Sequence, residues 1–155
     1  MKKITIILSI LLFSSVFAGC QSGTRAGNNG LKVYEFKEYS KTFLEDTTPV
    51  VKDESGENIT GDVKLVSESG VYSISKLMNG RFQGVDREYY ESGKLKAEVP
   101  FKDGKFHGLL KEYNESGKMQ YQMLYENGKA ISGYHWDSSG EKIEYTSDEI
   151  FNMNN

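Results

Sequence analysis

Few side chains in the sequence carry catalytic or metal-binding chemistry. The chain has one cysteine and two histidines among its 155 residues. It contains no nucleophile elbow, phosphate-binding glycine loop, paired-cysteine motif or HExxH zinc motif. The histidines, His107 and His135, are interpreted as exposed residues. Asp86, Glu88 and Glu112 could gather across neighbouring strands, but charges on the solvent-facing side of a strand are the commoner case. The sequence therefore predicts no catalytic residue, no metal site and no cofactor.

Cations and aromatic residues recur at a spacing that suits binding. Arg87 and Lys111 lie 24 residues apart, and each comes two residues before a tyrosine, Tyr89 or Tyr113. Trp136 takes the same position farther along the chain. Arg, Tyr and Trp are enriched at the energetic centres of protein interfaces. Phe82 and Phe106 share a second aromatic register. Two interpretations stay open: the aromatic side chains of both registers form the core of a sheet, which is the simpler one, or some of them contact a partner.

Regularly spaced glycines define the elements that would position these residues. Gly80, Gly104 and Gly128 follow one another at intervals of 24 residues, and Gly93 and Gly117 keep the same interval. The first three come after Asn or Asp, and the other two come after Ser. Glycine adopts positive φ without steric cost, and Asn and Asp tolerate it, so these pairs suit tight hairpin turns. The sequence therefore predicts a turn at each of these glycines.

Between the turns, apolar side chains occupy every second position. They are Leu95, Ala97, Val99 and Phe101 in one segment and Met119, Tyr121, Met123 and Tyr125 in the next. A period of two is typical of a half-buried strand. Each 24-residue unit is then one hairpin, and the predicted fold is all-β: an elongated, single-layer antiparallel β-meander of repeated hairpins. About four repeats are expected over residues 55–145, and two of them are clear.

The two clear copies resemble a known repeat. They read NGRFQGVDREYYESGKL (79–95) and DGKFHGLLKEYNESGKM (103–119), and they resemble the bacterial variant of the MORN repeat. The resemblance implies a fold of hairpins and a function in binding. MORN repeats are associated with protein scaffolding and phospholipid binding, and proteins built from this variant are described as antitoxin-like.

The N-terminal segment has the pattern of a secretory signal peptide. Lys2 and Lys3 precede an apolar run over residues 4–17, and small residues follow it. The run is short for a membrane span, and its charged start is typical of an export signal. The sequence therefore predicts that residues 1–19 are a signal peptide.

The end of this segment resembles a bacterial lipobox. Ala18-Gly19-Cys20 fits that pattern, although Phe17 replaces the usual leucine. The resemblance implies a lipid anchor, palmitate included, on Cys20 and attachment to a membrane of the cell envelope. Gln21 favours the outer membrane if the organism has one. The alternative is an ordinary signal peptide with an incidental cysteine. Residues 20–30 are polar and are interpreted as a flexible tether.

The remaining segments lie on either side of the repeats. Residues 31–54 are interpreted as an N-terminal cap over the edge of the first repeat, because open sheet edges promote aggregation. Residues 146–155 are interpreted as a polar tail or a small C-terminal cap. Removal of residues 1–19 takes two lysines from a chain of formal charge −3 and leaves −5, which argues against a nucleic-acid partner.

These observations favour a binding function over catalysis. The first hypothesis is a lipid-anchored envelope protein that acts as a protein-binding or scaffold module, with Arg87, Tyr89, Lys111, Tyr113 and Trp136 facing the partner. The alternative is an antitoxin or immunity-like protein that neutralises a toxin by binding it. An envelope enzyme is the least favoured hypothesis, because no set of converging acid and base groups is evident.

Overall fold

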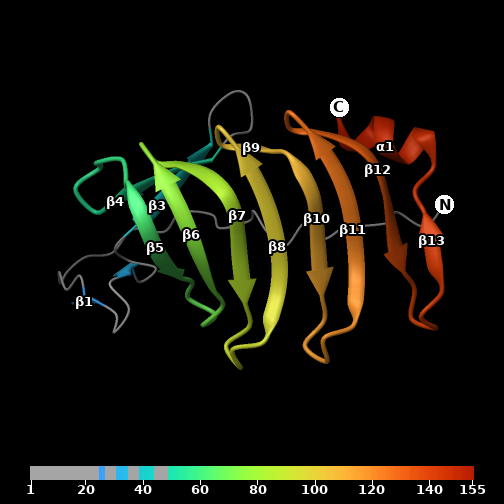
Figure 1. The fold of residues 1–155 in the computed structure, drawn as a ribbon, viewed down its shortest axis with the longest axis horizontal. Coiled ribbons are helices and arrows are strands. Elements are labelled where there is room, and N and C mark those ends of the chain that lie inside the picture. Colours follow the sequence, from blue (N-terminus) through green and yellow to red (C-terminus); the bar gives the residue numbers. More distant parts are fainter. Residues whose placement is uncertain (1–24, 27–30, 35–38, 44–48) are drawn as a thin grey trace.

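The computed structural model describes residues 25–26, 31–34, 39–43 and 49–155. Within these residues the main sheet has 11 strands in the order β1-β2-β5-β6-β7-β8-β10-β11-β12-β13, with β9 paired to β8. From β5 onward, neighbouring strands pair antiparallel and follow the order of the sequence, and Figure 1 shows them as one curved layer. This arrangement confirms the predicted meander of hairpins.

The strands of the main sheet are β1 (Arg25–Ala26), β2 (Lys32–Tyr34), β5 (Gly61–Val66), β6 (Tyr72–Met78), β7 (Arg81–Tyr89), β8 (Leu95–Lys102), β9 (Lys105–Phe106), β10 (Gly108–Tyr113), β11 (Met119–Glu126), β12 (Lys129–Trp136) and β13 (Lys142–Glu144). A separate antiparallel pair is formed by β3 (Tyr39–Phe43) and β4 (Pro49–Asp53), and a short helix, α1 (Ser147–Met153), follows β13.

The turns at Gly80, Gly104 and Gly128 each form a hydrogen bond to a residue that comes before their own hairpin. At Asp103-Gly104 both residues have positive φ, 54° and 80°, as a type I′ hairpin turn requires. The Gly104 amide also donates a 3.0 Å hydrogen bond to the carbonyl of Phe82, and the Gly128 amide donates a 2.8 Å bond to that of Phe106. Each of these turns is therefore held by the preceding repeat as well as by its own hairpin.

The two Ser-Gly turns adopt the same backbone conformation, and a side-chain oxygen closes the second of them locally. Gly93 and Gly117 have φ of 80° and 82°. At the second turn, Asn114 Oδ1 accepts hydrogen bonds from the Ser116 amide at 3.0 Å, the Ser116 hydroxyl at 2.6 Å and the Lys118 amide at 3.0 Å. The same arrangement, with an aspartate as the acceptor, closes the turns that begin at Asp53 and Asp137.

One face of the sheet, here called the inner face, carries the apolar core. Its buried members include Val63, Leu65, Leu77, Phe82, Ala97, Val99, Phe101, Leu110, Tyr121, Met123 and Tyr125. A ladder of rings crosses the strands at this face: Phe82–Phe101, Phe101–Phe106 and Phe106–Tyr125 have centroids 4.8, 5.1 and 5.1 Å apart. Ring pairs at this separation add to the stabilisation from buried area. The ladder therefore stabilises the packing between successive repeats.

The N-terminal end of the sheet is continued by the segment expected to be a cap. Strand β2 runs parallel to β5, the one parallel pair in the described part of the main sheet. Val50 and Val51 of β4 are buried, and the Val51 amide donates to the carbonyl of Gly80 at 2.8 Å. This segment therefore contacts the first repeat at its edge and at its turn.

Most of the C-terminal segment, which was expected to be a polar tail or a small cap, forms the helix α1. Thr146 and Glu149 make a reciprocal capping box at the start of α1. The apolar side chains of Ile150 and Met153 lie three residues apart on one side of the helix and pack against the core. The capping box and this apolar pair explain why so polar a segment is helical. No helix among the described residues is long and apolar enough to cross a membrane.

Candidate binding surface

The predicted site residues lie on the outer face, the side of the sheet opposite the core. Arg87, Tyr89, Lys111, Tyr113 and Trp136 are half-buried or exposed, whereas the residues that alternate with them in β7 are buried. The tyrosines and the tryptophan are outside the core cluster. The core interpretation is therefore wrong for these aromatic residues, but it is confirmed for Phe82, which is buried, and for Phe106, which packs against the core. The core is instead formed by the phenylalanine ladder and the alternating residues of β8 and β11.

A charged row crosses the outer face. Arg87 Nε lies 3.5 Å from Glu98 Oε1, and Lys111 Nζ lies 3.8 Å from Glu98 Oε2. Because β8 runs between β7 and β10, one carboxylate serves two cations. Ion pairs this exposed contribute about 0–1 kcal/mol each to stability. The row therefore has an excess of one positive charge and little structural role.

An aromatic row lies beside the charged row. Tyr72 and Tyr89 face each other across β6 and β7 and stack with ring centroids 5.1 Å apart. Lys64 Nζ lies 3.9 Å from the centre of the Tyr72 ring, and Lys142 Nζ lies 5.6 Å from that of Trp136. No local sequence pattern indicates Lys64, Tyr72 or Lys142, because these residues join the row only through strand register.

A third row on the outer face is apolar and open to solvent. Val85 pairs with Pro100, and Leu109 pairs with Leu124. Val85, Leu109 and Leu124 are each about two-fifths exposed, and Ile131 of β12 is 48% exposed. Adjacent exposed apolar side chains rimmed by polar residues mark interaction sites. The outer face thus offers apolar, charged and aromatic rows side by side.

The acids considered for catalysis lie on the inner face, not on the wet side of the sheet as predicted. Asp86 and Glu88 are only 5% and 8% exposed. Ser75 Oγ donates a 2.6 Å hydrogen bond to Asp86 Oδ1, and Lys96 Nζ lies 3.5 Å from Glu88 Oε2. The prediction failed because Glu88 pairs with the core residue Ala97 of the next strand, which an isolated strand pattern does not reveal.

The third of these acids, Glu112, has a different balance of charges around it. Burial raises the pKa of its carboxyl above the usual value, Lys96 opposes this shift and Glu88 adds to it. Lys96 is thus the cation that offsets two inner-face carboxylates. This accounts for a charge within a mostly apolar face without a catalytic role.

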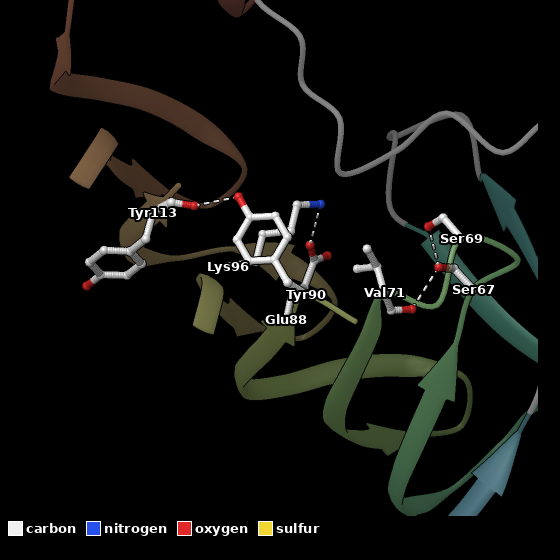
Figure 2. A network of polar contacts seen from close by, with 7 residues as sticks. All are labelled: Ser67, Ser69, Val71, Glu88, Tyr90, Lys96 and Tyr113. Atoms are coloured by element: carbon white, nitrogen blue, oxygen red, sulfur yellow. Dashed lines mark hydrogen bonds and ion pairs between the residues drawn. The ribbon is translucent and has the colours of Figure 1, made fainter. Parts of the chain in front are cut away.

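Figure 2 shows how the turn at Tyr90 is linked to the next repeat. The Tyr90 hydroxyl donates a 2.8 Å hydrogen bond to the carbonyl of Tyr113, while Lys96 reaches Glu88. Burial raises the pKa of Tyr90, with smaller contributions from Glu112 and Glu115. Tyr90 occupies the turn position that Asn114 takes one repeat later, so here a contact between repeats replaces the local side-chain cap.

The two histidines do not meet each other in the structure. His107 Nδ1 accepts a 3.4 Å hydrogen bond from the Asn127 amide at a hairpin turn. The His135 ring lies 4.8 Å from that of Tyr145. No group of three His, Cys, Asp or Glu side chains in the described ranges could hold a metal ion. Cys20, the predicted lipid attachment site, lies outside the described residues.

Two segments of the chain match a family model. Residues 83–103 and 106–127 match the family model described as MORN repeat variant. These ranges span β7 to β11, which carry Arg87, Tyr89, Lys111 and Tyr113 of the outer face. The comparison with curated proteins found no match. The matched unit is a binding repeat rather than a known enzyme family.

Proposed function

We propose that this MORN-repeat protein is a protein-binding module that a lipid on Cys20 holds at the cell envelope. The observation that carries the proposal is the outer face, where exposed apolar residues adjoin the charged and aromatic rows. Val85 and Leu109 lie beside the cations Arg87 and Lys111 on strands of the matched repeats. MORN repeats are in general binding modules.

A protein partner suits this surface because its residue types match those of interface centres. Arg, Tyr and Trp provide contact area and directed hydrogen bonds, and the apolar row provides surface to bury. Neutralising a toxin would use the same surface with a different partner. The identity of the captured protein therefore decides between a scaffold and an antitoxin.

Site-specific photocrosslinking tests the surface. A photoreactive amino acid replaces Leu109 on the outer face in one variant and Glu115, an exposed turn residue, in a matched control. We expect irradiation of intact cells to yield one discrete cross-linked partner from position 109 and none from position 115. The same products from both positions, or none from either, would refute a binding role for this face.

A second experiment tests the charged row. Arg87→Gln with Lys111→Gln removes both cations and leaves Glu98 without creating a cluster of acids. The melting temperature should stay nearly constant, because exposed ion pairs contribute little, whereas cross-linking from position 109 should fall. Lys118→Gln, at an exposed turn, is the matched control. Unchanged cross-linking would place the contact away from the charged row.

The anchor is tested separately. Intact-mass analysis of protein from the membrane fraction should give a chain that begins at Cys20 and carries acyl groups. Cys20→Ser should leave the protein unprocessed or release it from the membrane. An unmodified thiol at Cys20 in the mature protein would contradict the proposal.

A further inference from the structure

Near the C-terminal end of the sheet, the free edge of β12 is covered in two ways, by strand β13 along one part and by a side chain along another. Strand β13 pairs with only three residues of β12, which are Tyr134, His135 and Trp136. Beyond them, the chain leaves the sheet at Tyr145, whose amide donates a 3.0 Å hydrogen bond to the Gly133 carbonyl. Residues 129–132 of β12 therefore extend past the last strand, and α1 lies beside this end of the sheet (Figure 1).

A side chain takes the place of the missing strand there. The Ala130 amide donates a 2.8 Å hydrogen bond to Asn154 Oδ1, and Asn154 Nδ2 donates a 2.9 Å bond to the Ala130 carbonyl. This is the pair of bonds that a residue of a neighbouring antiparallel strand would exchange with Ala130. The side-chain amide of Asn154 thus makes the two hydrogen bonds that the backbone of one strand residue would make.

We propose that α1 and Asn154 form a cap that keeps β12 from pairing with β12 of a second copy of this chain. An uncapped strand edge is a template for pairing with another chain. Two identical strands can pair antiparallel about a two-fold axis, so this edge fits its own copy. The exposed Ile131 beside Ala130 would be covered in such a pair.

The way the cap is attached makes this function testable by single substitutions. Helix α1 has seven residues and no buried ones, and an isolated helix of this length is marginal in water. Its attachment depends on the partly buried Ile150 and Met153 and on the two Asn154 bonds. The next residue, Asn155, donates only to the Phe151 carbonyl within the same segment, at 2.7 Å, and provides a matched control.

Amide hydrogen exchange and native mass spectrometry test the proposal on the full chain in detergent. For Asn154→Ala we expect exchange at the Ala130 amide to accelerate by at least about tenfold, as for the loss of a hydrogen bond of about 1.4 kcal/mol, and for Asn155→Ala we expect no change. Deletion of residues 146–155 should produce dimers at concentrations where the wild type is a monomer.

Three outcomes would overturn the proposal. One is unchanged exchange at Ala130 in Asn154→Ala. Another is a folded deletion variant that stays monomeric at concentrations far above those used for the wild type. If the deletion variant does not fold, the mass of Asn154→Ala decides, and a strict monomer at high concentration is the third refuting result.

Discussion

Replacing Gly80 by alanine should destabilise the fold more than the same change at Gly117. Both glycines sit in turns with nearly equal positive φ, 77° and 82°. An alanine in this left-handed region costs about 1–2 kcal/mol at either position. The two substitutions therefore share the cost of backbone strain, and any further difference reports on the surroundings.

The space around the two glycines differs strongly. A Cβ at Gly80 would lie 2.7 Å from Val50 Cγ1 and 2.8 Å from the Val51 carbonyl oxygen, whereas a Cβ at Gly117 meets nothing within 4 Å. Gly80 is also fixed by 2.8 Å hydrogen bonds at its amide and its carbonyl, so the turn cannot move away freely. Overpacking of this kind costs about 1–3 kcal/mol. The expected loss is about 2–5 kcal/mol for Gly80→Ala and about 1–2 kcal/mol for Gly117→Ala.

Urea unfolding of both variants, followed by circular dichroism, measures these losses by linear extrapolation. The difference should appear in the midpoint, with the slope preserved. Equal losses for the two variants would refute the claim that the N-terminal segment packs against the first hairpin turn. A loss near zero at Gly117 would instead show that positive φ is not needed there.

Three further predictions concern other parts of the sheet. Asn114→Ala removes the acceptor of three hydrogen bonds, so chemical denaturation should show a loss of about 1–2 kcal/mol, whereas Ser138→Ala should change little. Phe101→Ala interrupts the ring ladder, and we expect a loss of about 3–5 kcal/mol in the same assay; a loss below about 1 kcal/mol would show that the ladder does not carry the core. Burial raises the pKa of Tyr145 from 10.0 to about 12. The folded state then keeps a proton that the unfolded state releases, so stability persists below pH 10 and falls as the pH rises toward 12. Absorbance at alkaline pH should show one fewer late-titrating tyrosine in Tyr145→Phe.

The glycine spacing was sufficient to predict the hairpins, because each turn has a local chemical requirement. Asn79, Asp103 and Asn127 all adopt positive φ before a glycine, and that preference is visible in two adjacent residues. The alternation in β8 and β11 likewise predicted which of their side chains are buried.

The assignment of faces in β7 and β10 could not be predicted in the same way. These strands carry acids on one side and tyrosines with cations on the other, so hydrophobicity alone suggested that the tyrosines were buried. Their orientation is fixed by pairing: Glu88 lies opposite Ala97, and Glu112 lies opposite the same residue from the other side. A small C-terminal cap was one of the two expectations for residues 146–155, but its attachment was not predicted, because the contact of Asn154 with Ala130 has no local sequence pattern.

The bonds that join successive repeats make the length of this protein an adjustable property. The Gly104 amide is hydrogen-bonded to the Phe82 carbonyl, and the Gly128 amide to that of Phe106, so the same contact recurs between neighbouring repeats. Inserting one more 24-residue copy would add two strands, or about 10 Å, without changing either end. In such a design, the number of repeat copies would set the length of the sheet, while the segments that cover its two ends stay the same.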